Sequence, residues 1–155
     1  MFRFNIRVYG IWMDPDGQVM VSDELIRGSR YTKFPGGGLE FGEGTRECLK
    51  REFMEELGVS VSIGEHIYTT DYFQLSAFNP EHQIISIYYH VHLLEPLTAR
   101  LSATPFSFDE AQMITYEKEN ETESFRMVPL NELSEDLVTL PIDKIVVGLL
   151  KKQQL

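Results

Sequence analysis

Alternating apolar and polar positions mark the start of the chain. Within Met1–Tyr9 every second residue is apolar, namely Phe2, Phe4, Ile6 and Val8. Because side chains alternate between the two faces of a strand, this pattern predicts a strand with one apolar face. The turn sequence Asp14–Gly17 follows, and Gln18–Ser22 is predicted as a short second strand. A loop is then expected to lead to the glycine-rich segment Lys33–Gly38.

The apolar spacing changes to that of a helix after the glycine-rich segment. We expect the helix to start near Gly44 or Thr45 and to run to Leu57, with Gly58 as its C-terminal cap. One stripe of this helix is apolar and is predicted to face the core: Leu49, Phe53 and Leu57.

Two long runs rich in β-branched and aromatic residues follow the helix. They are Val59–Phe78 and Gln83–Leu94, and the turn sequence Asn79–His82 joins them. This arrangement predicts a long antiparallel pair of strands.

The last third of the chain predicts shorter elements. Ala111–Glu117 and Phe125–Val128 are predicted as strands around a polar loop, Lys118–Ser124. Asn131–Leu137 and Pro141–Lys152 are predicted as helices, the second with proline in its first turn. Strands mixed with about three helices predict an α+β or α/β fold with a mixed sheet.

Length and composition place few further limits on the protein. At 155 residues, 43% apolar and 25% charged, the chain is expected to form a single domain over residues 1–155. No apolar run is long enough to span a bilayer, and the first residues follow a strand pattern, not a signal-peptide pattern. A cytoplasmic location is therefore expected. Cys48 is the only cysteine, which excludes an internal disulfide and a cysteine-based zinc site.

The charge of the chain limits its partners. The formal net charge of −10 argues against a nucleic-acid polymer, because phosphate backbones are bound by Lys and Arg. A small phosphate compound stays possible, provided that a metal cation mediates its binding to an acidic site.

The predicted helix after the glycine-rich segment carries an acidic stripe. Glu52, Glu55 and Glu56 are three and four residues apart and therefore share a face. One interpretation is a solvated acidic surface, softened by Arg51 pairing with Glu47 or Glu55. The other is a site for a hard divalent cation, since Mg²⁺ prefers oxygen ligands from carboxylates, waters and substrate phosphates.

The full spacing around this helix decides between the two interpretations. Gly37, five residues, Glu43, seven residues and then Arg51-Glu52-Phe53-Met54-Glu55-Glu56-Leu57-Gly58-Val59 resembles the Nudix box at every specified position. From average residue frequencies, a chance match is on the order of one in 10 million. Phe34–Gly37 and Val128–Leu133 also resemble Nudix segments. The resemblance implies an α/β/α sandwich around a mixed β-sheet.

The resemblance also implies roles for residues of the box. Glu52, Glu55 and Glu56 are expected to bind Mg²⁺ or Mn²⁺, with the Gly37 carbonyl as a possible further ligand. Arg51 is expected to orient these carboxylates by hydrogen bonding. Glu43 either ties the loop to the helix or takes part in catalysis.

Residues outside the box are expected to complete the site. Many Nudix enzymes take their general base from a Glu in a loop before the late strand, and Glu119, Glu121 and Glu123 occupy the corresponding loop here. Of these, Glu123 is preferred, unless a metal-bound hydroxide or Glu52 takes this role. The substrate-binding candidates are Gly37, Gly38, Arg30 and Lys33, although ordinary loop solvation accounts equally well for the last two.

The function implied is metal-dependent hydrolysis of the pyrophosphate bond in a nucleoside diphosphate linked to another moiety, such as a nucleoside triphosphate or a nucleotide sugar. The alternative is a non-catalytic Nudix-fold domain that binds nucleotide as a sensor or interaction module. An isoprenoid diphosphate isomerase is disfavoured, because its catalytic cysteine has no counterpart outside the box helix.

Substrate and assembly are less well defined by the sequence. Leu75, Ser76 and Ala77 lack the proline and tyrosine markers of ADP-ribose and diadenosine polyphosphate hydrolases. A homodimer is possible, with Ile84–Leu94 and Ile142–Leu150 as apolar segments for its interface.

Overall fold

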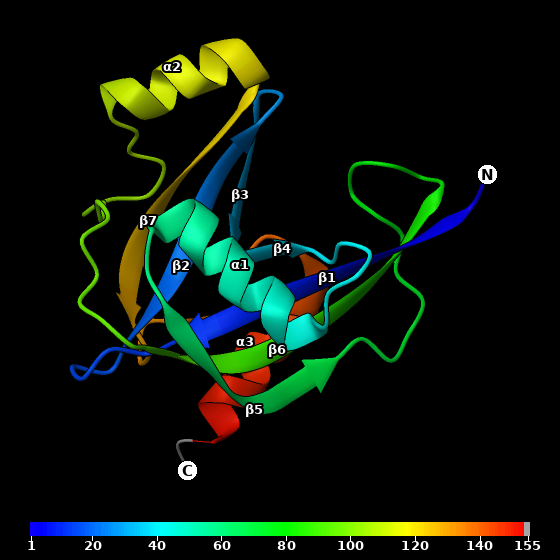
Figure 1. The fold of residues 1–155 in the computed structure, drawn as a ribbon, viewed down its shortest axis with the longest axis horizontal. Helices are drawn as coiled ribbons and strands as arrows, with labels where there is room; N and C mark the ends of the chain where they lie inside the picture. The colour runs from blue at the N-terminus through cyan, green and yellow to red at the C-terminus, as the bar shows by residue number, and fades with distance from the viewer. Residues whose placement is uncertain (154–155) are drawn as a thin grey trace. The chain divides into compact units, whose positions relative to one another are not determined.

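The computed structural model describes residues 1–153 (Figure 1). The chain divides into two compact units. The first unit consists of Met1–Trp12 and Pro35–Thr98, and the second of Met13–Phe34 and Ala99–Leu155. Their elements are, in chain order, β1 (Arg3–Trp12), β2 (Gln18–Ile26), β3 (Ser29–Lys33), β4 (Gly36–Gly38), α1 (Thr45–Leu57), β5 (Val61–Thr69), β6 (His82–Leu93), α2 (Glu110–Glu119), β7 (Glu121–Pro129) and α3 (Pro141–Lys152). No helix within residues 1–153 is long and apolar enough to cross a membrane.

The first unit is built on a mixed sheet with the strand order β4-β1-β6-β5. β1 runs parallel to β6, whereas β4 and β5 pair antiparallel with their neighbours. α1 contacts β1, β4 and β5 (Figure 1). Its apolar stripe is buried as predicted, and Gly10 lets the Phe53 ring approach the sheet, since a Cβ at Gly10 would lie 2.8 Å from that ring. The packing of α1 therefore fixes the helix that carries the acidic residues.

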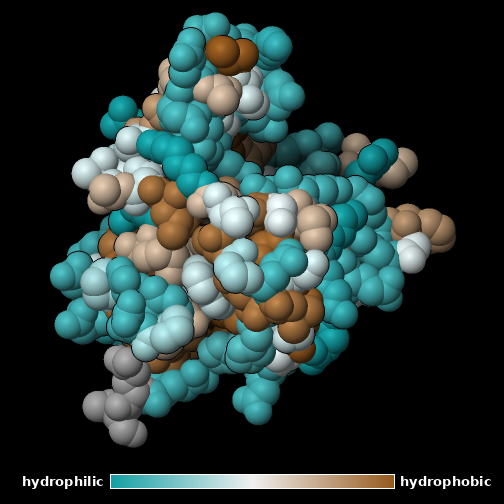
Figure 2. All heavy atoms as spheres, turned by 60° about the vertical axis from the view of Figure 1, so that its left-hand side comes forward, coloured by the Kyte–Doolittle hydropathy of each residue, from teal (hydrophilic) through white to brown (hydrophobic). Residues whose placement is uncertain are grey.

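The second unit contains an antiparallel sheet with the order β3-β2-β7, together with α2 and α3. α3 begins with Pro141 and has one buried face, as the sequence predicted. α2 differs, because it has no buried residue, and hydrophilic side chains cover most of the α2 end of the molecule (Figure 2). A capping box between Asp109 and Gln112 stabilises its first turn.

Most of the predicted elements are confirmed. They include the first strand, the start of the second, the antiparallel pair β5 and β6, and the C-terminal helix. β5, however, ends at Thr69, so residues 70–78, which were predicted as strand, lie outside it. α1 ends as predicted at Gly58, which is left-handed with φ 63° and donates its N–H to the Met54 carbonyl. The α+β class with a mixed sheet is also confirmed.

Three predictions in the last third of the chain are wrong. Residues 111–117, predicted as a strand, lie in α2, because the capping box outweighs the strand preference of the β-branched residues inside it. The predicted polar loop at residues 118–124 consists of the end of α2 and the start of β7, joined at Asn120. Residues 131–137, predicted as a helix, form separate turns.

The sequence analysis predicted a β2 that was too short and missed β3. β2 continues to Ile26, and β3 pairs with it from Ile26↔Ser29 to Ser22↔Lys33. Arg27 and Gly28 form the two-residue connection, and both have positive φ, at 49° and 81°. Such a connection is typical of a tight β-hairpin.

The two apolar segments considered for a dimer interface are largely used inside the chain. β6 lies between β1 and β5, and its Tyr88, Tyr89 and Val91 are buried. Ile142, Val146, Val147 and Leu150 of α3 are buried as well. These residues therefore provide no argument for an interface.

Candidate active site

The glycine-rich segment forms β4, whose backbone lies against α1. A Cβ at Gly36, where φ is 147°, would lie 2.1 Å from the Val8 carbonyl oxygen, so only glycine fits there. A Cβ at Gly37 would lie 2.5 Å from both Cδ and Oε1 of Glu52. The Glu52 carboxylate thus packs directly on the Gly37 backbone, and it is mostly buried, with 12% of its side chain exposed.

Arg51 joins the acidic residues of this site to the glycine-rich segment. Its Nε and Nη2 donate to the two carboxylate oxygens of Glu43, at 3.0 and 2.7 Å. Its Nη1 donates to Glu52 at 2.9 Å and to Glu55 at 3.2 Å. Its Nη2 also donates to the Gly38 carbonyl at 3.0 Å. One guanidinium therefore holds three carboxylates and one loop carbonyl together.

The loop between β4 and α1 closes in a tight turn at residues 40–43. The Glu43 N–H donates to the Glu40 carbonyl at 3.3 Å, and the Glu40 N–H donates to the Glu43 carboxylate at 3.0 Å. Gly42 has φ 97°, a conformation that glycine adopts without strain. Glu40 also lies 3.7 Å from Nη1 of Arg51. Phe41, inside this turn, is fully exposed.

The hydrogen bonds of the site change the ionisation of its groups. The hydrogen bond from Arg51, followed by that from the Glu40 backbone, lowers the pKa of Glu43 to about 2. The same contact with Glu43 raises the pKa of Arg51 above its usual value. Cys48 is buried, and its thiol donates to the Gly38 carbonyl at 3.5 Å. Burial, followed by the hydrogen bond with Glu43, raises its pKa to about 12.

The oxygen donors of this site fit a hard divalent cation. No group of three acidic, histidine or cysteine side chains within residues 1–153 already stands in a metal-binding arrangement. Mg²⁺, however, usually takes only one or two carboxylates and keeps several waters. Glu52 and Glu55, which both accept hydrogen bonds from Nη1 of Arg51, supply two carboxylates. Glu56 directly follows Glu55 and is half-buried. The metal-binding roles expected of Glu52, Glu55, Glu56 and the Gly37 carbonyl stay predictions.

The predicted base Glu123 lies in the second unit, in β7 and not in a loop. It is half-buried and accepts a hydrogen bond from the Ser22 hydroxyl at 3.1 Å. Its register partner on β2 is Glu24, so the two carboxylates lie on the same face of the sheet. The sequence analysis missed Glu24, because the face that it shares with Glu123 depends on the pairing of β2 with β7, which residue spacing does not indicate.

The two basic candidates also lie in the second unit. The Lys33 side chain is only 6% exposed, and its ammonium donates to Glu24 at 3.2 Å. Arg30 is exposed, and its guanidinium lies 5.4 Å from the centre of the Phe106 ring. Lys33 is therefore engaged in a buried ion pair, whereas Arg30 is accessible from solvent.

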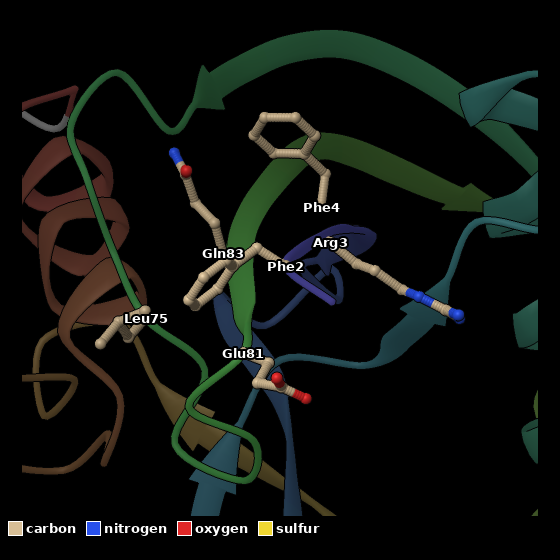
Figure 3. Close-up of a pocket in the computed structure, with 6 residues that line it drawn as sticks. All are labelled: Phe2, Arg3, Phe4, Leu75, Glu81 and Gln83. Carbon is tan, nitrogen blue, oxygen red and sulfur yellow. The ribbon is translucent and has the colours of Figure 1, made fainter.

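A cavity of about 200 Å³ lies elsewhere in the first unit, at the start of β1 and β6 (Figure 3). It is lined by Phe2, Arg3, Phe4, Leu75, Glu81 and Gln83. None of these residues belongs to the glycine-rich segment or to the Arg51 cluster. The cavity is thus no part of the acidic site.

Comparisons with known proteins identify the family. The family model described as NUDIX domain matches residues 3–147. A MutT protein from Methanosarcina mazei Go1 is similar in structure, with a TM-score of 0.68, 16% identity and coverage of 99% of this chain and 96% of that chain. The ORF135 protein of E. coli has a TM-score of 0.66 and 18% identity, with coverage of 99% and 90%. No curated protein sequence matches the chain.

A pyrophosphatase of known structure has the same fold. An ADP-ribose pyrophosphatase from Streptococcus suis 89-1591 has a TM-score of 0.53 and 15% identity, with coverage of 97% of this chain and 91% of that chain. At such identities these structures support the fold alone. The family model, in contrast, matches most of the sequence, including Arg51 and the box carboxylates that it binds. The chain therefore belongs to the Nudix family of pyrophosphohydrolases, which act on nucleoside diphosphate derivatives.

Proposed function

We propose that this protein hydrolyses the pyrophosphate bond of a nucleoside diphosphate linked to another moiety, with Mg²⁺ or Mn²⁺ as cofactor. The observation that carries the proposal is the Arg51 cluster, in which one guanidinium holds Glu43, Glu52 and Glu55 beside the glycine backbone. Structures with this fold include a UDP-X diphosphatase and an ADP-ribose pyrophosphatase, which supports a substrate of this class.

The cation would be held by the carboxylates of Glu52, Glu55 and Glu56, with the Gly37 carbonyl as a further ligand. When bound, it neutralises phosphate charge and lowers the pKa of water. Because Gly37 has no side chain, the Glu52 carboxylate lies directly on its backbone, which would let both groups serve the same cation.

Arg51 and Glu43 would orient this site. Because the pKa of Glu43 is about 2, its carboxylate stays ionised at neutral pH and keeps its two hydrogen bonds with Arg51. Arg51 in turn fixes the directions of the Glu52 and Glu55 carboxylates. Such preorganisation saves the substrate the cost of ordering these side chains when it binds.

The remaining roles fall to residues of both units. Glu123 is proposed as the general base, which would take the proton of the attacking water. Arg30 and the glycine backbone at Gly37 and Gly38 are proposed to contact the phosphates. Lys33 would join them only if its ion pair with Glu24 opened.

We further propose that the two units act as one catalytic domain over residues 1–155. The match of a single family model to residues 3–147, which include parts of both units, supports this proposal. The homodimer and the cytoplasmic location expected from the sequence stay predictions.

A panel of nucleoside diphosphate derivatives with Mg²⁺ or Mn²⁺ tests the activity. Wild type should cleave at least one compound, and Glu56→Gln should lose most of the turnover at unchanged thermal stability. Glu47→Gln is the matched control, because Glu47 is an exposed residue of the same helix outside the motif. If wild type cleaves nothing but binds nucleotide in a metal-dependent way, the sensor function replaces the enzyme.

A second pair of variants tests the base. Glu123→Gln keeps an oxygen that can accept the Ser22 hydrogen bond, so its fold should persist. We expect kcat to fall about 100-fold or more, with loss of the acidic limb of the pH profile, because that limb reports the deprotonation of the general base. Glu121→Gln, at an exposed position of the same strand, should behave as wild type. Turnover of Glu123→Gln equal to that of Glu121→Gln would remove Glu123 from the mechanism.

A further inference from the structure

The turn at residues 40–43 presents an aromatic ring to solvent beside the candidate active site. Phe41 is fully exposed and Met54 is 47% exposed, whereas Leu49, Phe53 and Leu57 of the same motif are buried. An exposed phenylalanine gains nothing from the fold, because burial is what makes its side chain stabilising. A single exposed apolar residue needs no explanation in itself. Phe41 is of interest because the turn that carries it is bonded to the groups of the acidic site.

The turn that carries Phe41 is held in place by the same groups that organise the acidic site. Two hydrogen bonds between Glu40 and Glu43 close the turn. Arg51 holds the Glu43 carboxylate through two further bonds and also binds Glu52. Phe41 is therefore attached to a fixed backbone, two residues, or at most about 7 Å of chain, from Glu43.

The charges around this ring restrict what it can bind. Glu40 and Glu43 flank the turn, and Glu43 stays ionised at neutral pH because its pKa is about 2. An anionic phosphate is disfavoured next to these carboxylates unless a cation lies between them. A flat, uncharged aromatic group suits the position, because it can stack on the ring and carries no charge.

We propose that Phe41 is a specificity-determining residue that stacks on the nucleobase of a substrate whose diphosphate binds beside Gly37 and Glu52. This inference rests on the proposed function and narrows its substrate class to nucleotides with an accessible base. Stacking on an aromatic side chain tolerates any base, because every base has a π face. Phe41 thus selects for the presence of a base and not for its identity.

Steady-state kinetics of Phe41→Ala tests this proposal on a nucleotide that wild type cleaves. KM should rise at least about fivefold, the lower end of what the loss of one base–aromatic stack costs, with kcat within twofold. Phe41→Trp should restore KM, because it restores an aromatic face. Phe73→Ala is the matched control, since Phe73 is an exposed phenylalanine of the same unit outside the motif.

A base-free compound separates stacking from an effect on the turn. The inhibition constant of inorganic tripolyphosphate should be equal for wild type and Phe41→Ala. An unchanged nucleotide KM, or an equal loss for nucleotide and tripolyphosphate, overturns the role of Phe41 and leaves the hydrolase function intact. If the wild type cleaves no nucleotide in the panel, the proposed hydrolase function is itself refuted, before the role of Phe41 is tested.

Discussion

A methyl group at Gly37 is the smallest change that should disturb the acidic site. In Gly37→Ala the new Cβ would lie 2.5 Å from Cδ and Oε1 of Glu52 and 2.7 Å from Oε2. Ordinary carbon contacts are about 3.5–4.0 Å, so the carboxylate has to move by about 1 Å or more. It cannot move without loosening its 2.9 Å hydrogen bond with Arg51.

The size of the effect follows from these contacts. Forcing a methyl group into a packed site costs about 1–3 kcal/mol, and loss of a hydrogen bond between charged groups costs about 1.5–3 kcal/mol. Relaxation reduces one cost at the expense of the other, so we expect a loss of about 1–3 kcal/mol in the free energy of unfolding. For activity, a catalytic group displaced by about 1 Å can cost about 100-fold in rate.

Gly38→Ala is the control for this experiment. Its Cβ would meet only Nη1 of Arg7, at 3.6 Å, which is an ordinary contact. The free energy of unfolding in urea should therefore differ between the two variants, with Gly38→Ala near wild type, and kcat/KM should fall further in Gly37→Ala. The double variant Gly37→Ala with Glu52→Asp should regain stability, because the shorter side chain leaves room for the methyl group. The reasoning is refuted if the two single variants unfold and turn over alike.

Three other changes test the Arg51 cluster. In Arg51→Lys one ammonium cannot replace five hydrogen bonds, so kcat/KM should fall about 100-fold; a loss below fivefold in steady-state assays contradicts this. The folded pKa of Glu43, about 2, lies below the ordinary 4.5, so its charge stabilises the fold fully above about pH 4.5, and that stability is lost as the pH falls towards 2. Urea midpoints of wild type and Glu43→Gln should thus converge in acid, and a constant difference from pH 7 to pH 2.5 argues against it. Cys48, buried and with a pKa of about 12, should react with a thiol reagent at pH 8 much more slowly in the folded protein than in urea; equal rates would disprove its protection.

Local sequence signals were sufficient for the helix that carries the site. The apolar spacing of Leu49, Phe53 and Leu57 and the glycine at position 58 act within α1 itself, so no distant contact had to be known. The same helical spacing placed Arg51 and Glu55 one turn apart, and the structure joins them at 3.2 Å. The choice between a solvated surface and a cation site depended instead on the full motif.

Features that depend on distant parts of the chain were not predictable. The bonds of Arg51 with Glu43 and with the Gly38 carbonyl require the loop to fold back on α1, which spacing alone does not indicate. The strand at the end of the predicted loop 118–124 was missed for a similar reason. β7 starts at Glu121 because it pairs with β2 as far as Ile26, whereas the alternating pattern predicted that β2 ends at Ser22. Only in α2 was a local signal overlooked, the capping box of Asp109.

The Arg51 cluster also means that the fold of the protein does not depend on the supply of the metal cofactor. Because the guanidinium already compensates part of the charge of Glu43, Glu52 and Glu55, these carboxylates have a partner supplied by the chain itself. A chelator should accordingly abolish turnover while the thermal unfolding temperature hardly changes, and added Mg²⁺ should restore turnover at once. The enzyme would then persist through periods of scarce magnesium as a folded apoprotein, and its activity would follow the free cation concentration without any cycle of unfolding and resynthesis.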